Sequence, residues 1–242
     1  MLGVTKAERE LAQQLRVDPY TDFTPLRKGL EDVAQVIAAG DLTVTGAISA
    51  IPGGAGIAVG ATSTASDVAN SIYTKTSREI AEIVTKKIQG LGVDEATTKA
   101  FVENYFYSPA DQFAIAEALE NLHAANPAAF IARATAAGSF DVAKFTRYRA
   151  ELLAKDSPKL GTLKDFIIVS DIAINHDASG RLVAAFPFDG VYWTESVSQS
   201  LTRLSTDAKS VNHPRAIGST GALSPMATGA LKKLGWAIVK VN

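Results

Sequence analysis

The residues that come closest to forming a chemical site lie in one short polar run between a predicted strand and a predicted helix. The run consists of Gly218, Ser219, Thr220 and Gly221. At such a junction, free backbone amides and the helix dipole favour an anion. His213 and Arg215 lie just upstream and would add charge to the same edge. The run matches neither common phosphate-binding motif, and Gly and Ser also suit an ordinary turn. A ligand site and a plain strand-to-helix turn therefore both remain open.

Other residues that commonly do chemistry are scarce. The histidines, His123, His176 and His213, have no second histidine at the short spacing of a metal site, so we predict neither a metal nor a cofactor. The absence of cysteine excludes disulfides and thiolate catalysis. The chain also lacks the G-x-S-x-G and S-x-x-K patterns of serine nucleophiles. No catalytic residue is predicted, and the sequence leaves open whether the protein is an enzyme.

Composition indicates a folded protein that does not bind nucleic acid. The 242 residues are 47% apolar and 20% charged, enough for one large or two ordinary domains. The 24 basic and 25 acidic residues give a formal charge of −1 and are spread along the chain. This distribution provides no basic stripe to attract a polyanion, so nucleic acid is not an expected partner.

The elements that would position any site surround an uncharged segment, residues 42–66, rich in Gly, Ala, Ser and Thr. We interpret it as two short buried helices, residues 44–51 and 56–73, joined by a Pro-Gly-Gly turn. Insertion into a membrane or a partner is the alternative. A membrane span is not favoured, because Pro52 interrupts a segment that would need roughly 20 predominantly apolar residues.

Residues 1–159 are predicted to form an all-helical domain around this segment. Thr5 and Glu8 form a capping box for the first helix. Thr24 is the predicted N-cap of the second, and Asp94 and Ser139 are predicted to cap later helices. The helix after Ser139 is expected to turn four side chains inward: Val142, Phe145, Tyr148 and Leu152.

Residues 160–242 are predicted to form a small α/β domain of order ββαβαβ, so that the chain as a whole has an α+β fold. Residues 166–175 and 181–188 are expected to be two strands of a hairpin with its turn at 176–180. A helix capped by Thr194 and a strand at 215–219 follow. A helix opened by Ser224 then leads to a last strand at 236–241, through a right-handed crossover.

The chain resembles a family of uncharacterised bacterial proteins, several of which begin with an export signal. The resemblance lies in LGVTKAERELAQQLRVDPYT near the start, the AGDLTV and IPGGAG segments, YSPADQFAIAEALENL, and GALSPMATGALKKLGW near the end. It implies a periplasmic or cell-envelope protein and no particular activity. The printed start, MLGVTKAERE, has neither the basic nor the apolar region of a signal peptide, so the cytoplasm is the alternative.

The sequence favours a non-enzymatic binding or scaffold protein of the bacterial envelope, with a protein as a possible partner. One alternative is a small-molecule or anion-binding protein, enzymatic or not, that uses residues 218–221. Another is a protein that inserts into a membrane through residues 42–66.

Overall fold

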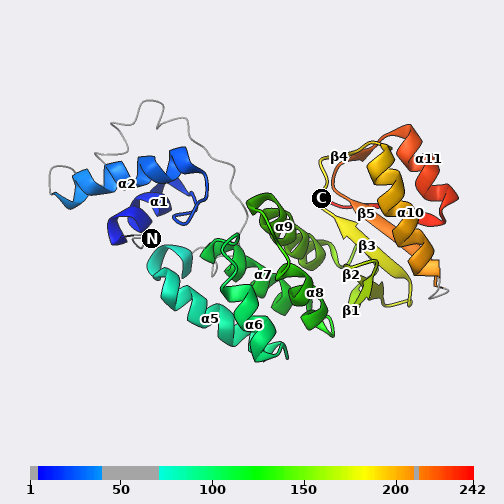
Figure 1. Cartoon of the computed structure of the whole chain (residues 1–242), viewed down its shortest axis with the longest axis horizontal. Helices are drawn as coiled ribbons and strands as arrows, with labels where there is room; N and C mark the ends of the chain where they lie inside the picture. The colour runs from blue at the N-terminus through cyan, green and yellow to red at the C-terminus, as the bar shows by residue number, and fades with distance from the viewer. Residues whose placement is uncertain (1–4, 40–70, 210–212) are drawn as a thin grey trace. The chain divides into compact units, whose positions relative to one another are not determined.

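A computed structural model of the chain describes residues 5–39, 71–209 and 213–242. The uncharged segment at residues 42–66 lies outside the described residues, and with it the helix predicted at 44–51 and residues 56–70 of the helix predicted at 56–73. Residues 71–73, the end of that second prediction, are described and are helical. The chain divides into two compact units, Met1–Lys86 with Tyr105–Ala114, and Lys87–Asn104 with Ile115–Asn242. Among the residues described, Figure 1 shows helices in the first part of the chain and the strands in its last third.

The first unit is helical. It contains α1 (Lys6–Leu15), α2 (Thr24–Ala38) and the first parts of α5 (Ser77–Gly90) and α7 (Pro109–Leu122). A small core, Leu11, Ala12, Val17 and Leu30, holds α1 and α2 together because each helix turns an apolar face to the other.

The predicted start of α1 is confirmed, and the predicted start of α2 is one residue out. The Thr5 hydroxyl accepts from the Glu8 amide, and the Glu8 carboxylate accepts from the Thr5 amide. In α2 the N-cap is Phe23, which supplies no side-chain hydrogen bond, and Thr24 is the first helical residue. Pro25 fits this position because its missing amide proton would have no partner in the first turn.

The second unit combines helices with a sheet. Its helices, besides the last parts of α5 and α7, are α6 (Glu95–Val102), α8 (Pro127–Ala134), α9 (Phe140–Asp156), α10 (Glu195–Lys209) and α11 (Pro225–Lys233). Its strands are β1 (Leu163–Val169), β2 (Ile172–Asp177), β3 (Leu182–Phe186), β4 (Gly190–Val191), β5 (Arg215–Ser219), β6 (Ala222–Leu223) and β7 (Trp236–Lys240).

The main sheet is mixed, with strand order β1-β2-β3-β5-β7, and the fold is α+β as predicted. The first three strands pair antiparallel. β3, β5 and β7 are parallel, with α10 between β3 and β5 and α11 between β5 and β7 along the chain. A second, two-stranded sheet pairs β4 with β6 in parallel. β4 follows β3 and β6 follows β5 along the chain, so the connections after β3 and β5 are paired with each other. Residues of this pairing line the candidate site described below.

The predicted single strand at 166–175 is wrong. It is two strands, β1 and β2, which pair with each other around Ser170 and Asp171. Both turn residues have left-handed backbone conformations, with φ of 50° and 64°. Such torsions suit a two-residue hairpin, although glycine or asparagine usually provides them. The sheet therefore has one more strand than the predicted ββαβαβ order.

The sheet lies between two pairs of helices (Figure 1): α8 and α9 cover one face, and α10 and α11 cover the other. The compact units therefore differ from the predicted division after residue 159, because α8 and α9 pack on the sheet and belong to its unit. The core on the α10 side includes Phe186, Leu204, Ile217, Leu231 and Trp236, all less than 10% exposed.

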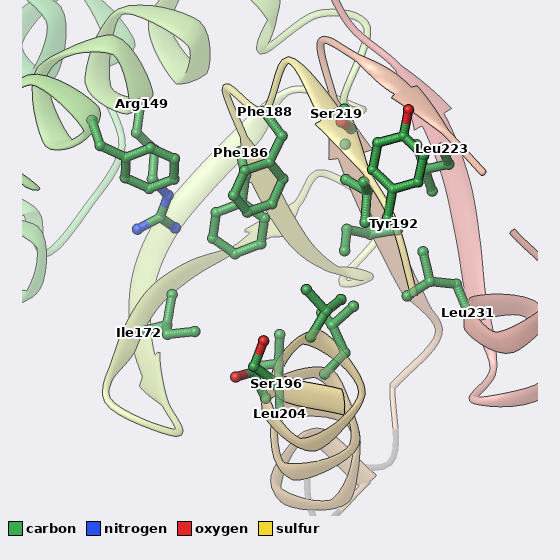
Figure 2. A pocket seen from close by; sticks show the side chains of 18 of the residues that line it. Arg149, Ile172, Phe186, Phe188, Tyr192, Ser196, Leu204, Ser219, Leu223 and Leu231 are labelled. Carbon is green, nitrogen blue, oxygen red and sulfur yellow. The ribbon is translucent and has the colours of Figure 1, made fainter. Parts of the chain in front are cut away.

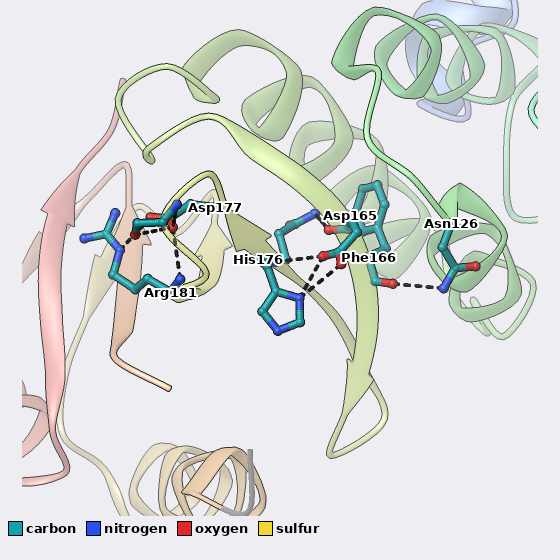
Figure 3. Close-up of polar contacts among 8 residues, drawn as sticks. Asn126, Asp165, Phe166, His176, Asp177 and Arg181 are labelled. Carbon is teal, nitrogen blue, oxygen red and sulfur yellow. Dashed lines mark hydrogen bonds and ion pairs between the residues drawn. The ribbon is translucent and has the colours of Figure 1, made fainter. Parts of the chain in front are cut away.

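Three polar contacts lie beside the paired strands β1, β2 and β3 (Figure 3). At one edge, the Asn126 side-chain amide donates to the Phe166 carbonyl at 2.9 Å, and His176 Nδ1 lies 2.9 Å from Asp165 Oδ1. In the turn between β2 and β3, Asp177 accepts from the Arg181 Nε at 2.8 Å. The first two contacts help to hold β1 and β2 together beside α8, and the third closes the turn that leads into β3.

Candidate ligand-binding cavity

A cavity of about 590 Å³ lies inside the second unit, between the sheet and α10 (Figure 2). Protein interiors are close-packed and leave few voids larger than a water molecule. Small-molecule sites, in contrast, occupy roughly 300–1,000 Å³. The volume of this cavity lies within the range of small-molecule sites.

Apolar side chains form most of the cavity wall. Phe186, Ile172 and Ile217 come from the strands, and Leu201 and Leu204 from α10. Three aromatic rings follow one another along one side: the centroids of Phe145 and Phe188 are 5.6 Å apart, and those of Phe188 and Phe186 are 5.2 Å apart. This wall suits the apolar body of a ligand and offers it flat rings to pack against.

The cavity reaches solvent beside Tyr192, whose side chain is 73% exposed although it lines the cavity. Two exposed serines of α10, Ser196 and Ser200, line the same wall. The loops here are joined by the pairing of β4 with β6 and by a hydrogen bond of 2.9 Å from the Ser224 amide to the Val191 carbonyl. The β4–β6 pairing thus holds the connection with Tyr192 and the connection with Leu223 side by side in the cavity wall.

Arg149 of α9 lines the cavity opposite Tyr192 (Figure 2) and is only 8% exposed. Burial lowers its pKa to about 10, so that the guanidinium still carries its charge at neutral pH. Within the described part of the chain, no acidic side chain pairs with it. Its Cζ lies 5.0 Å from the Phe186 ring centroid and 5.7 Å from that of Phe130, which partly stabilises the charge.

The backbone around Arg149 explains how a side chain of α9 reaches a cavity on the other side of the sheet. β2 and β3 pair at Asn175–Val183 and His176–Leu182. In this register Ala173 would lie opposite Ala185, two positions beyond Asn175 and Val183, but no pairing is formed there. The Arg149 guanidinium donates to both of these carbonyls instead, with Nε 3.0 Å from the Ala185 oxygen and Nη2 bonded to the Ala173 oxygen. Arg149 therefore occupies a gap between two strands.

The other charged residues of the wall are paired with each other at its edge. Arg133 lies 3.6 Å from the carboxylate of Asp171, which Arg203 also approaches at 3.5 Å. Asp171 is two-thirds exposed, so this pairing is a weak surface interaction. Arg149 is thus the one buried cation among the described residues that line the cavity.

Two of the predicted site residues line the cavity: Gly218 and Ser219, at the end of β5. A side chain at position 218 would also meet Leu160 on the opposite face, at 2.9 Å. The other two residues of the run, Thr220 and Gly221, lie against the backbone of residues 188 and 189. The Thr220 hydroxyl donates to the Phe188 carbonyl at 2.7 Å, and a Cβ at Gly221 would lie 2.0 Å from the Asp189 carbonyl oxygen.

Arg215 and His213 lie elsewhere. Arg215 is at the start of β5, whereas residues 218–221 are at its end, and its guanidinium donates to the carbonyls of Ser205 and Leu234, each at 2.9 Å. The His213 ring lies 5.5 Å from the ring of His176. The structure therefore does not bring the six predicted residues into one site, and an anion site made of all of them stays a prediction.

Sequence reasoning missed Arg149, although a signal was present. Arg149 follows Phe145 by four positions and precedes Leu152 by three, so it lies on the apolar face predicted for α9. Tyr148 and Val142, both predicted to face inward, are 44% and 48% exposed. A charged residue on an apolar helical face could have indicated that Arg149 is buried at a site.

Within residues 5–39, 71–209 and 213–242, no three His, Asp or Glu side chains are grouped as metal ligands. No helix of these residues has the length and apolar character that crossing a membrane requires. Comparison of the chain with protein-family models, with curated proteins and with solved structures found no match.

Proposed function

We propose that the second unit is a non-enzymatic binding protein for a small, largely apolar molecule, which occupies the cavity between the sheet and α10. The observation that carries this proposal is a cavity of about 590 Å³ walled by apolar and aromatic side chains. A large apolar pocket with a few polar groups is the usual form of a small-molecule site.

Gly218 and Ser219 support the same proposal in part, since both line the cavity. The expected ligand at the end of β5 is then a molecule that enters the cavity, rather than an ion held at the surface of the turn. Phe145, Phe186 and Phe188 provide the packing surface for its apolar part.

The experiment is calorimetric titration of the full chain with 1-decanol, a neutral probe with an apolar chain. Val197 is half-buried on α10 and lines the cavity, so Val197→Trp is expected to fill part of the space and weaken binding at least tenfold. Thr202 is exposed on the same helix and is not part of the wall, so Thr202→Trp is the matched control. No binding to the wild type, or equal binding to the two variants, would overturn the proposal.

For the location we propose the bacterial cell envelope, most simply the periplasm. The support is the resemblance of the first and last segments of the chain to an envelope-associated family. Cell fractionation of the native host with a chromosomally tagged copy tests it, and recovery of the protein in the cytoplasmic fraction alone would contradict it.

Two other roles remain proposals of lower rank: a scaffold that binds a protein partner, and insertion into a membrane through residues 42–66. That segment is uncharged, which motivates the second role. Flotation with liposomes separates them, because protein that stays in the bottom fraction with both zwitterionic and anionic lipid does not insert.

A further inference from the structure

We propose that the ligand of this cavity carries a single carboxylate and that Arg149 pairs with it at the inner end of the cavity. This inference rests on the proposed function, because it names the chemical class of the molecule that the cavity binds. It predicts an amphipathic anion. Its apolar body would lie along Phe145, Phe186 and Phe188, and its one negative charge beside the Arg149 guanidinium.

The first step is the count of hydrogen-bond donors. A guanidinium has five N–H groups. Arg149 donates from Nε to Ala185 and from Nη2 to Ala173, whereas Nη1 donates to no described residue. The side chain lines the cavity, and Figure 2 shows its nitrogens beside Ile172 and Phe186. Donors therefore remain for a ligand oxygen.

The second step concerns charge. Bridging two carbonyls requires two N–H groups, and the uncharged amide of glutamine also supplies two. An arginine brings a positive charge into a site where it is 8% exposed and has no acidic partner among the described residues. A buried charge is costly unless it is paired. An anionic ligand would provide the missing partner.

The third step selects the anion. Among the described residues of the wall, Arg149 is the one buried cation, because Arg133 lies at the edge and pairs with Asp171. One guanidinium balances one negative charge, and its planar fork matches a carboxylate. A phosphate with two charges would leave one of them unpaired in an apolar cavity. We therefore infer a monocarboxylate.

The first test compares decanoate with 1-decanol by calorimetric titration of the full chain. We expect the wild type to bind decanoate more tightly. Arg149→Gln is expected to weaken decanoate binding at least tenfold while 1-decanol binding changes less than twofold, and Arg149→Lys is expected to lie between. Arg203→Gln, which removes a charge outside the wall, is the control. Equal affinities of the wild type for the two probes would overturn the inference.

The second test needs no variant, so it holds even if Arg149→Gln does not fold. The carboxyl carbon of ¹³C-labelled decanoate is followed by NMR as pH falls, free and bound to the wild type. A neighbouring guanidinium is expected to lower the pKa of the bound carboxyl by about one unit or more. An unchanged or raised pKa would overturn the inference and leave the proposed function standing. If neither probe binds, the proposed function fails and the inference with it.

Discussion

The guanidinium of Arg215 lies over the indole ring of Trp236, with its Cζ 5.5 Å from the ring centroid. The same guanidinium donates to the carbonyls of Ser205 and Leu234, and the Trp236 Nε1 donates to the Ser205 hydroxyl at 2.7 Å. Arg215 thus connects β5 and β7 with the helix α10. These contacts assign it a structural role at the end of the sheet away from residues 218–221.

Arg215→Met is therefore expected to lower the free energy of unfolding by about 2 kcal/mol, through the loss of charged hydrogen bonds and of the cation–π contact. The measurement is urea denaturation, with Arg203→Met as control, since Arg203 is two-thirds exposed and its ion pair contributes little. Binding of 1-decanol by folded Arg215→Met is expected to stay within twofold of the wild type. A large loss of binding would instead favour a ligand site that includes Arg215.

Gly221 and Gly190 lie in the two connections that the β4–β6 pairing joins, and they provide a matched pair of substitutions. A Cβ at Gly221 would lie 2.0 Å from the Asp189 carbonyl oxygen, whereas at Gly190 the nearest atom is Tyr192 Cε2 at 3.7 Å. Gly221→Ala is expected to cost about 3 kcal/mol, because backbone must move. Gly190→Ala is expected to change stability by about 0.5 kcal/mol or less. Thermal unfolding of both variants measures the difference, and equal effects would show that the close approach is absent.

Asp177 makes the stability of the second unit depend on acid pH. Burial acts to raise the pKa of its carboxyl, but hydrogen bonds from Ser179 and Arg181 outweigh burial and lower it. The stabilisation is then fully present above the unfolded-state pKa of about 3.9 and is lost as pH falls through the lower folded-state pKa. Asp177→Asn is expected to cost about 2 kcal/mol at pH 7. Denaturant unfolding between pH 7 and pH 2 should show this difference shrinking, and a constant difference would contradict the assignment.

Tyr20 is expected to make the first unit sensitive to alkali. Burial raises its pKa to about 12, and its hydroxyl donates to the Lys75 carbonyl at 2.7 Å. A raised folded-state pKa stabilises the protein below the unfolded-state value of about 10, and this contribution is lost as pH rises towards 12. Tyr20→Phe should cost about 1 kcal/mol at pH 7.

The alkaline loss of stability should be smaller in Tyr20→Phe than in the wild type, as followed by circular dichroism between pH 9 and 12. Tyr192→Phe is the control, because Tyr192 is 73% exposed and its hydroxyl makes no hydrogen bond to a described residue. Identical alkaline curves for wild type and Tyr20→Phe would show that another group controls this transition.

Sequence-based prediction succeeded where the physical cause was local. The caps by Asp94, Ser139 and Ser224 were predicted from residue type alone, because Asp and Ser side chains readily accept from amides of the first helical turn. In the structure each side chain accepts from the amide three residues ahead. It failed at Ser170 and Asp171, where a hairpin turn forms with neither glycine nor asparagine. Apolar residues on both sides of this pair read as one strand, and only the pairing of β1 with β2 shows that there are two.

The sequence by itself determined the α+β class, most helix starts and the order of the last helices and strands, since caps, turns and apolar periodicity act over a few residues. The tertiary structure alone decided that Arg149 meets the cavity. Its partners Ala173 and Ala185 are 24 and 36 residues away along the chain. The gap that Arg149 occupies arises because β2 and β3 stop pairing after two residue pairs. The point at which two strands separate depends on both strands together and cannot be predicted from the residues of either one.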